Sequence, residues 1–233
     1  MITSRENEKL KLIRKLGSAR QREKLGLFVA EGEDLVEAAR AEGVEPVELL
    51  SAGENVSAEL LAEVSRLAHP PRVIAVFRRA DLPQRRLPPV GLALWRVADP
   101  GNVGTLIRSA DALGPAFVAL SPGCADPTGP KAIRASMGAL FRVVLIAFDD
   151  APRPWIALVP RGGSPVGATA GATLVLGAER GGLPAEVLSR CDGRATIPLA
   201  EGADSLNVAT AGAIALYERS GRRATQIASS PPA

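Results

Sequence analysis

Three segments in the second half of the chain each join a short apolar run to a turn and then to a helical pattern. They are DPGNVGTLIRSADALG (99–114), LVLGAERGGL (174–183) and IPLAEGADSLNVATAGAIALYE (197–218), called here the first, second and third signatures. A turn of this kind places small and polar residues at the end of a strand, where α/β proteins usually bind ligands. The signatures therefore predict one ligand site at the strand ends of an α/β domain.

The rest of the second half keeps the same alternation. Strands are expected at 90–98, 116–121, 141–148, 172–177 and 194–199, and helices at 102–113, 128–138, 184–190 and 205–219. The strands are continuous apolar runs, which is expected when helices cover both faces of a parallel sheet. The predicted fold class is therefore α/β with a parallel sheet.

A second, smaller α/β unit precedes residue 80. Helices are expected at 4–20, 33–42 and 57–67, and strands at 25–32, 47–51 and 72–78. The following stretch FRRADLPQRRLPPVG combines three prolines with four arginines, a composition that blocks regular structure. We therefore expect an N-terminal domain at 1–78, a linker at 79–89, a second domain at 90–220 and a flexible tail at 221–233.

The net charge of +3 is unevenly placed, because residues 1–24 hold eight Lys and Arg against three Glu. A basic face on a nearly neutral body suits contact with a phosphate backbone, although a solvated helix face explains the same charge equally well. Candidate RNA contacts in this region are Arg5, Lys9 and Arg20.

Several classes of protein are disfavoured by what the sequence lacks. No apolar run reaches the about 18 residues of a membrane span, and the N-terminal residues have no apolar signal-peptide core. Cys124 and Cys191 lie far apart and outside any CxxC pattern, which disfavours a disulfide framework or a structural zinc site. We expect a cytoplasmic protein without a metal and without membrane contact.

The first signature has clear local mechanics. Asp99, Pro100 and Gly101 form a turn, and Asn102 is suited to cap the helix that follows. Arg108 falls on a different face from the apolar stripe of this helix, so it is free to project into a site or across a subunit boundary. On the residues alone, Asn102 as a plain cap and Arg108 as a solvated side chain remain the alternatives.

The residues of the second and third signatures can also be explained by local structure alone. Gly177 and its small neighbours let a ligand approach backbone amides, with Glu179 as the carboxylate of the turn. A nucleotide-phosphate loop is disfavoured, because neither GxGxxG nor GxxxxGK[ST] occurs. In the third signature, Ser205 fits a helix N-cap and Asn207 a first-turn residue.

Together and in this order, the signatures resemble the three sequence motifs of the SpoU/TrmH family of RNA 2′-O-ribose methyltransferases, which belong to the SPOUT superfamily. The segment FVAEGEDLVEAA (28–39) resembles the substrate-binding domain of many members. The resemblance implies a parallel-sheet SPOUT-type domain with a C-terminal trefoil knot, preceded by a small ribosomal-protein-like RNA-binding domain. It also implies a homodimer that completes its active site across the interface. Knots are rare, so the resemblance alone supports this one.

The resemblance also implies residue roles. The implied cofactor is S-adenosylmethionine, and DPTGPKAIRASMGALFRV (126–143) resembles the cofactor-side stretch of the family. Ala178 departs from the polar residue of many relatives. The implied catalytic residues are Asn102, Arg108, Glu179, Ser205 and Asn207. The implied cofactor-binding residues are Leu176, Gly177, Ile197, Leu199, Leu206, Val208 and Ala209. Lys131 and Arg134 are candidate contacts to RNA phosphates, with a solvated helix face as the alternative.

The reaction requires a ribose 2′-hydroxyl to lose its proton while its oxygen attacks a sulfonium methyl group in line. No general base is obvious, since the single histidine, His69, lies outside the second domain. A guanidinium with a pKa above about 12 is a poor base. We therefore expect Arg108 to bind a substrate phosphate and to promote loss of the hydroxyl proton.

The N-terminal domain favours ribosomal RNA as the substrate, and no residue names the nucleotide. The alternatives are a tRNA ribose methyltransferase and an RNA-binding protein of this fold without activity. The joint presence of all five implied catalytic residues argues against lost activity. A metabolic enzyme that uses a dinucleotide is disfavoured by the missing glycine fingerprint.

Overall fold

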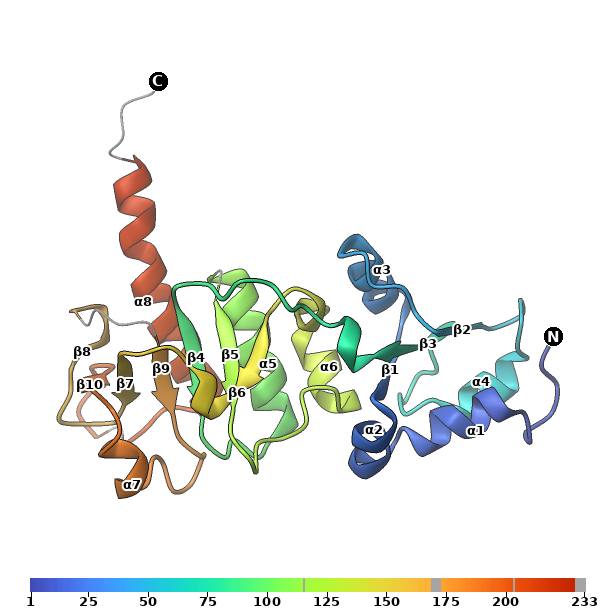
Figure 1. Cartoon of the computed structure of the whole chain (residues 1–233), viewed down its shortest axis with the longest axis horizontal. Coiled ribbons are helices and arrows are strands. Elements are labelled where there is room, and N and C mark those ends of the chain that lie inside the picture. Colours follow the sequence, from blue (N-terminus) through green and yellow to red (C-terminus); the bar gives the residue numbers. More distant parts are fainter. Residues whose placement is uncertain (115, 169–172, 203, 229–233) are drawn as a thin grey trace.

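The computed structural model describes residues 1–114, 116–168, 173–202 and 204–228. Two sheets lie toward opposite ends of an elongated molecule (Figure 1). The N-terminal sheet is antiparallel with strand order β1-β3-β2, and the second sheet is parallel with order β6-β5-β4-β9-β7-β10-β8. The predicted fold class, a parallel α/β domain preceded by a smaller α/β domain, is confirmed.

The N-terminal domain packs four helices around its sheet. Its strands are β1 (Leu27–Glu31), β2 (Glu48–Ser51) and β3 (Val73–Arg78). Its helices are α1 (Glu8–Lys15), α2 (Ala19–Leu25), α3 (Glu33–Ala41) and α4 (Ala58–Val64). The single helix predicted over 4–20 is wrong, because the chain leaves the helical conformation after α1 and Ser18 is extended before α2 begins. Gly17 lies at this break, and glycine is a poor helix former.

The described residues of the second domain form seven strands. They are β4 (Gly91–Leu94), β5 (Phe117–Leu120), β6 (Leu145–Ala147), β7 (Trp155–Leu158), β8 (Ser164–Pro165), β9 (Thr173–Leu176) and β10 (Gly193–Thr196). The sequence reading missed β7 and β8, and only 145–147 of the strand predicted over 141–148 is extended, since 139–141 form a 3-10 turn. Short apolar runs are ambiguous by pattern alone, and β7 is further disguised by flanking prolines at 154 and 160.

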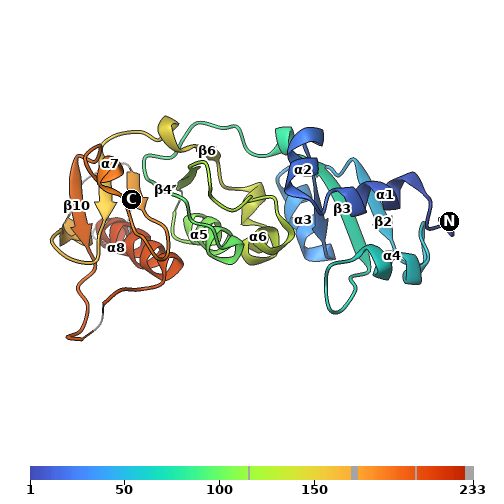
Figure 2. The same cartoon turned by 90° about the horizontal axis from the view of Figure 1, so that it is seen from below.

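Both faces of the parallel sheet are covered (Figure 2). The helices are α5 (Pro100–Ala112), α6 (Pro130–Ser136), α7 (Ala185–Leu188) and α8 (Val208–Ala228). Strand β4 illustrates the packing, because Leu92 and Leu94 join the core under α5 and α8, whereas Ala93 joins the opposite core with Val187 of α7. This double coverage explains why the strands are continuously apolar.

Helix α8 begins three residues later than predicted and continues past residue 219 to Ala228. Residues 229–233 of the predicted tail lie outside the described residues. The helix packs closely on α5, since a Cβ at Gly212 would stand 2.3 Å from the Leu106 side chain and 3.1 Å from that of Leu176. None of the helices placed by the structure is both long and apolar enough to cross a membrane.

The three signatures start at the same edge of the sheet. The first follows β4, the second follows β9, which pairs directly with β4, and the third follows β10. All three strands run parallel within one sheet, so their carboxyl ends meet at this edge. The fold therefore brings together residues that lie about 100 positions apart in sequence, such as Asn102 and Asn207.

Candidate functional site

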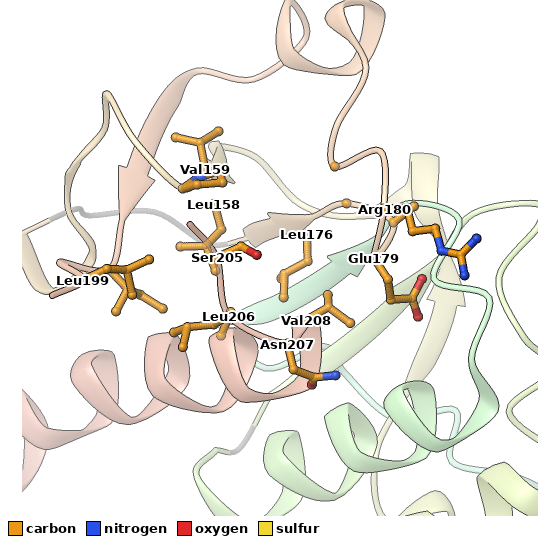
Figure 3. Close-up of a pocket in the computed structure, with 16 residues that line it drawn as sticks. Leu158, Val159, Leu176, Glu179, Arg180, Leu199, Ser205, Leu206, Asn207 and Val208 are labelled. Carbon is orange, nitrogen blue, oxygen red and sulfur yellow. The ribbon is translucent and has the colours of Figure 1, made fainter. Parts of the chain in front are cut away.

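A pocket of about 480 Å³ opens at the carboxyl edge of the sheet (Figure 3). Six of the seven residues predicted to bind the cofactor line it: Leu176, Gly177, Ile197, Leu199, Leu206 and Val208. The seventh, Ala209, does not line the pocket but is 4% exposed and packs into the core. Cofactor binding by Ala209 stays a prediction, and its place on the first turn of α8 turns the side chain into the core.

The sequence reading missed one wall of this pocket. Leu158, Val159 and Pro160 come from the end of β7, which lies between β9 and β10 in the sheet. The apolar run WIALVP was the available signal, but strand order cannot be read from it. Figure 3 shows Leu158, Leu199 and Leu206 on one side of the pocket and Glu179 with Arg180 on the other. The pocket thus has an apolar end and a polar end.

Gly177 is required by a close approach of the backbone. The second signature turns back on itself, because the Gly182 N–H donates to the Ala178 carbonyl over 2.9 Å. A Cβ at Gly177 would stand 2.2 Å from the Gly182 carbonyl carbon and 2.5 Å from the Leu183 nitrogen. Only glycine fits where the strand leaves the sheet, so this turn holds Glu179 at a fixed place beside the pocket.

A network of side chains connects the first, second and third signatures. The Asn102 Nδ2 donates to Glu179 Oε1 over 3.0 Å, and the Asn207 Nδ2 donates to Asn102 Oδ1 over 3.2 Å. The backbone N–H of Asp99 also donates to Glu179 Oε1, over 3.2 Å. Three of the five predicted catalytic residues are therefore in direct contact, and Ser205 lines the same pocket.

The structure corrects both helix caps. Asp99, and not Asn102, caps α5, with Oδ1 accepting the Asn102 N–H over 3.0 Å. Asn207, and not Ser205, starts α8, because its Oδ1 accepts the N–H groups of the residues two and three positions later. This exchange has a consequence for the site: the Asn102 amide is released to bind Glu179, and both ends of the Asn207 amide are engaged.

The environment of Glu179 keeps it ionised. Partial burial alone would raise the pKa of this carboxyl, but the hydrogen bonds from the Asn102 amide and from backbone N–H groups outweigh burial and lower the pKa from its ordinary value of 4.5. Its charge is compensated by hydrogen bonds without an ion pair among the described residues. Glu179 is therefore an acceptor at neutral pH and not a proton donor.

The candidate RNA-binding residues fall into two groups. Arg5 pairs with Glu63, Lys9 pairs with Glu48 over 2.6 Å, and Lys131 pairs with Asp99 over 2.9 Å. Arg20 and Arg134 are exposed and make no ion pair with the residues that the structure places. The hydrogen bond from Lys131 lowers the pKa of the Asp99 carboxyl, with a further contribution from the Asn102 N–H.

Arg108 stands apart from the other predicted catalytic residues. It is exposed on the third turn of α5 and does not line the pocket. It also makes no ion pair with any residue in the described part of the chain. Of the described residues that line the pocket, Arg180 is the only basic one. A single chain therefore places Asn102, Glu179, Ser205 and Asn207 together and leaves Arg108 outside.

The pocket suits a ligand that has both an apolar part and a polar part. The pocket volume lies within the range of about 300–1,000 Å³ typical of small-molecule sites. Its apolar end can hold a flat or aliphatic group, and its exposed polar end can meet a second substrate at the surface. No group of three or more His, Cys, Asp and Glu side chains suited to a metal ion occurs among the residues placed by the structure.

Comparison with known proteins shows the family to which the chain belongs. Residues 89–217 match the SpoU rRNA Methylase family, and residues 7–78 match the MRM3-like substrate binding domain. The chain belongs to the SpoU rRNA Methylase family. Membership confirms the resemblance seen in the three signatures and the predicted class of enzyme, a methyltransferase. The trefoil knot stays a prediction.

Similar proteins cover nearly the whole chain. An uncharacterized tRNA/rRNA methyltransferase from Synechocystis is 32% identical over 99% of this chain and 96% of its own. The 23S rRNA (guanosine(2553)-2′-O)-methyltransferase RlmP from Bacillus subtilis is 29% identical over 94% of this chain and 99% of its own. The AdoMet-bound rRNA methyltransferase from Sinorhizobium meliloti has a TM-score of 0.83 and 29% identity, covering 95% of this chain and 97% of its own.

Proposed function

We propose that this SpoU-family chain transfers a methyl group from S-adenosylmethionine to a ribose 2′-hydroxyl of ribosomal RNA. The observation that carries the proposal is the pocket at the carboxyl edge of the sheet, whose polar end is lined by Glu179 and Asn207, both hydrogen-bonded to Asn102. The relative from Sinorhizobium meliloti binds AdoMet, and RlmP is named for 2′-O-methylation of 23S rRNA, which supports both the cofactor and the substrate class.

The pocket residues fit the two halves of the cofactor. Leu199, Leu206 and Leu158 offer apolar contact for the adenine and the methionine chain, and the backbone at Gly177 allows close approach. S-adenosylmethionine supplies the methyl group as an electrophilic sulfonium substituent. The protein's task is then to align the ribose oxygen with that methyl group and to exclude other orientations.

The polar network sets the electrostatics at the open end of the pocket. Glu179 is ionised and held by Asn102, so its charge and the Asn207 amide lie at the polar end of the pocket, where they would stabilise a positively charged group of the cofactor. Ser205 is exposed on the pocket lining and is suited to orient the ribose by a hydrogen bond. None of these groups needs to leave its position for the reaction.

We infer that Arg108 acts from a second subunit of a homodimer. It is exposed on α5 and lies outside the pocket of its own chain, yet a guanidinium is the group best suited to bind a substrate phosphate. Placed across a subunit interface, it would hold the RNA beside the 2′-hydroxyl and favour loss of the proton. The two free cysteines agree with a reducing compartment, and we propose that the enzyme acts in the cytoplasm.

Labelled methyl transfer to deproteinised ribosomal RNA, followed by nuclease mapping of ribose-methylated dinucleotides, tests the reaction. We expect ribose methylation at one site of the large-subunit RNA. Methylation of tRNA instead would move the substrate to the alternative class, and tight RNA binding without transfer would overturn the enzyme assignment.

The role of Arg108 is tested by Arg108→Ala, with Arg194→Ala as a control on another exposed arginine outside the pocket. We expect Arg108→Ala to abolish transfer while S-adenosylmethionine binding is retained. Mixing this variant with a pocket-defective variant should restore about a quarter of wild-type activity, because half of the randomly formed dimers then carry one complete site. No recovery on mixing would refute action from the second subunit.

A further inference from the structure

A partly buried ion triad joins the two domains. Asp126, in the loop between β5 and α6, accepts hydrogen bonds from Arg22 Nε over 2.8 Å and from Arg79 Nη2 over 2.8 and 2.9 Å. Arg22 lies on α2, and Arg79 opens a 3-10 turn (Arg79–Asp81) directly after β3. One carboxylate of the second domain therefore receives two guanidinium groups from the N-terminal side. Figure 1 shows this junction, where α6 faces α2 and β1.

The triad is held from both sides. Arg22 is 5% exposed, and its Nη1 donates to the carbonyls of Leu16 and Gly17 over 2.9 and 3.1 Å. On the other side, the hydroxyl and the N–H of Thr128 donate to Asp126 Oδ1 over 2.7 and 2.9 Å. If the side chain of Arg22 or Asp126 turned away, polar groups with little access to water would lose their hydrogen bonds. The relative position of these two side chains is therefore restricted.

The two domains are also held together by apolar packing, which does not require the ion triad. Phe28 and Phe77 of the N-terminal domain pack against Phe141, with ring centroids 5.1 to 6.1 Å apart, and all three are fully buried. Apolar contact holds two bodies together but is non-directional. Buried ion pairs add little net stability over apolar residues, whereas the planar fork of arginine fixes orientation. The triad therefore serves to fix the angle between the two domains more than to strengthen their association.

The same loop leads to the methyl-transfer site. Asp126 lies five positions before Lys131 of α6, which pairs with Asp99, the cap of α5. Helices α5 and α6 are packed so closely that a Cβ at Gly104 would stand 2.3 Å from the Ala132 carbonyl oxygen. The loop that fixes the N-terminal domain is thus connected through α6 to α5, the helix that carries Asn102 of the polar network.

We propose that Asp126 is a positioning residue that, with Arg22 and Arg79, fixes the angle of the N-terminal domain so that bound RNA presents its ribose to the pocket. The inference rests on the proposed function and takes the N-terminal domain, which matches the MRM3-like substrate binding domain, as the part that binds the RNA. It concerns orientation, so it makes a physical prediction that does not depend on activity.

The test uses the full chain with Asp126→Ala and, as a matched control, Asp192→Ala. Asp192 also binds an arginine and a backbone N–H, accepting from Arg153 over 2.8 Å and from Trp155 over 2.7 Å, but entirely within the second domain. Residual dipolar couplings are measured separately for the two domains. We expect a common alignment tensor in the wild type and in Asp192→Ala, and divergent tensors in Asp126→Ala.

Kinetics with deproteinised large-subunit ribosomal RNA give the second readout. A loosened domain angle should lower kcat by about tenfold or more, because misplacement of a bound substrate is costly, while the Kd for S-adenosylmethionine stays within about threefold. Arg79→Ala, whose side chain is 31% exposed, is a milder variant that keeps the test available if Asp126→Ala does not fold. It should change both readouts in the same direction.

Common tensors in folded Asp126→Ala and Arg79→Ala would overturn the proposal, as would divergent tensors with unchanged kcat. Failure of the proposed function is recognised separately, since an absence of methyl transfer by the wild type leaves the alignment measurement intact.

Discussion

Replacing Gly177 with alanine tests whether the backbone of the second signature shapes the pocket. The new Cβ would stand 2.2 Å from the Gly182 carbonyl carbon, 2.4 Å from its oxygen and 2.5 Å from the Leu183 nitrogen. Carbon atoms in ordinary contact are about 3.5–4.0 Å apart, so backbone must move by about an ångström or more. Strand β9 is paired on both sides, and the displacement therefore falls on the turn that carries Glu179.

The expected cost follows from the clash. Overpacking of this kind costs about 1–3 kcal/mol, which corresponds to a loss of about 5-fold to 150-fold in affinity if the displaced turn must be restored on binding. Isothermal titration with S-adenosylmethionine measures the change directly. We expect Gly177→Ala to bind at least about tenfold more weakly than the wild type, with a fall in Tm of a few degrees.

Gly181→Ala is the matched control, because it lies in the same turn. A Cβ at Gly181 has no atom within 4 Å, and its φ is outside the left-handed region. We expect wild-type affinity for this variant. Wild-type affinity of Gly177→Ala would refute the clash. An equal loss of affinity in both variants would indicate that the turn needs glycine for flexibility and not for space.

Two further predictions concern charge and hydrogen bonding. Asn102→Ala removes the donor to Glu179 and the acceptor of Asn207, so we expect kcat/KM for RNA to fall at least about tenfold, with a change in Tm no larger than that of an ordinary exposed substitution. An unchanged kcat/KM would exclude the network from the reaction. The second prediction concerns stability at acidic pH. Burial tends to raise the pKa of Asp126, but hydrogen bonds from Thr128 and the charges of the two arginines outweigh burial and lower the pKa below its ordinary value of 3.8. Its contribution to stability is therefore complete above the unfolded pKa and is lost as pH falls through the lower folded pKa. Thermal melts between about pH 5 and pH 3 should show a shallower loss of Tm for Asp126→Asn than for the wild type, and parallel curves would contradict the shift.

The roles of Asn102 and Asn207 show how much of the site could be predicted from local sequence pattern. The sequence predicted Asn102 as the cap of one helix and Ser205 as the cap of the other, with Asn207 in the first turn, and both caps were wrong: Asp99 caps α5 and Asn207 caps α8. Capping depends on which residue is extended, and a shift of three positions moves the cap from Asn102 to Asp99. The hydrogen bond from Asn102 to Glu179 spans 77 positions and has no local signal.

Strand β7 marks a second limit. Its apolar run is short and lies between prolines, so neither periodicity nor length distinguished it from a loop. Its insertion between β9 and β10 depends on pairing with both neighbours, which is a property of the sheet as a whole. The pocket wall formed by Leu158 and Val159 was therefore out of reach of sequence reasoning.

By itself, the sequence determined most of the elements and the places where chemistry is possible: most of the apolar strands, most of the helices and the small polar turns that end three strands. These features follow from local propensity and periodicity, which act over a few residues. Only the tertiary structure decided the order of strands, the contact of Asn102 with Glu179, and the burial of Arg22 against Asp126. Such contacts join residues that are distant in the chain, because each is set by the packing of whole elements against one another and not by the residues beside it.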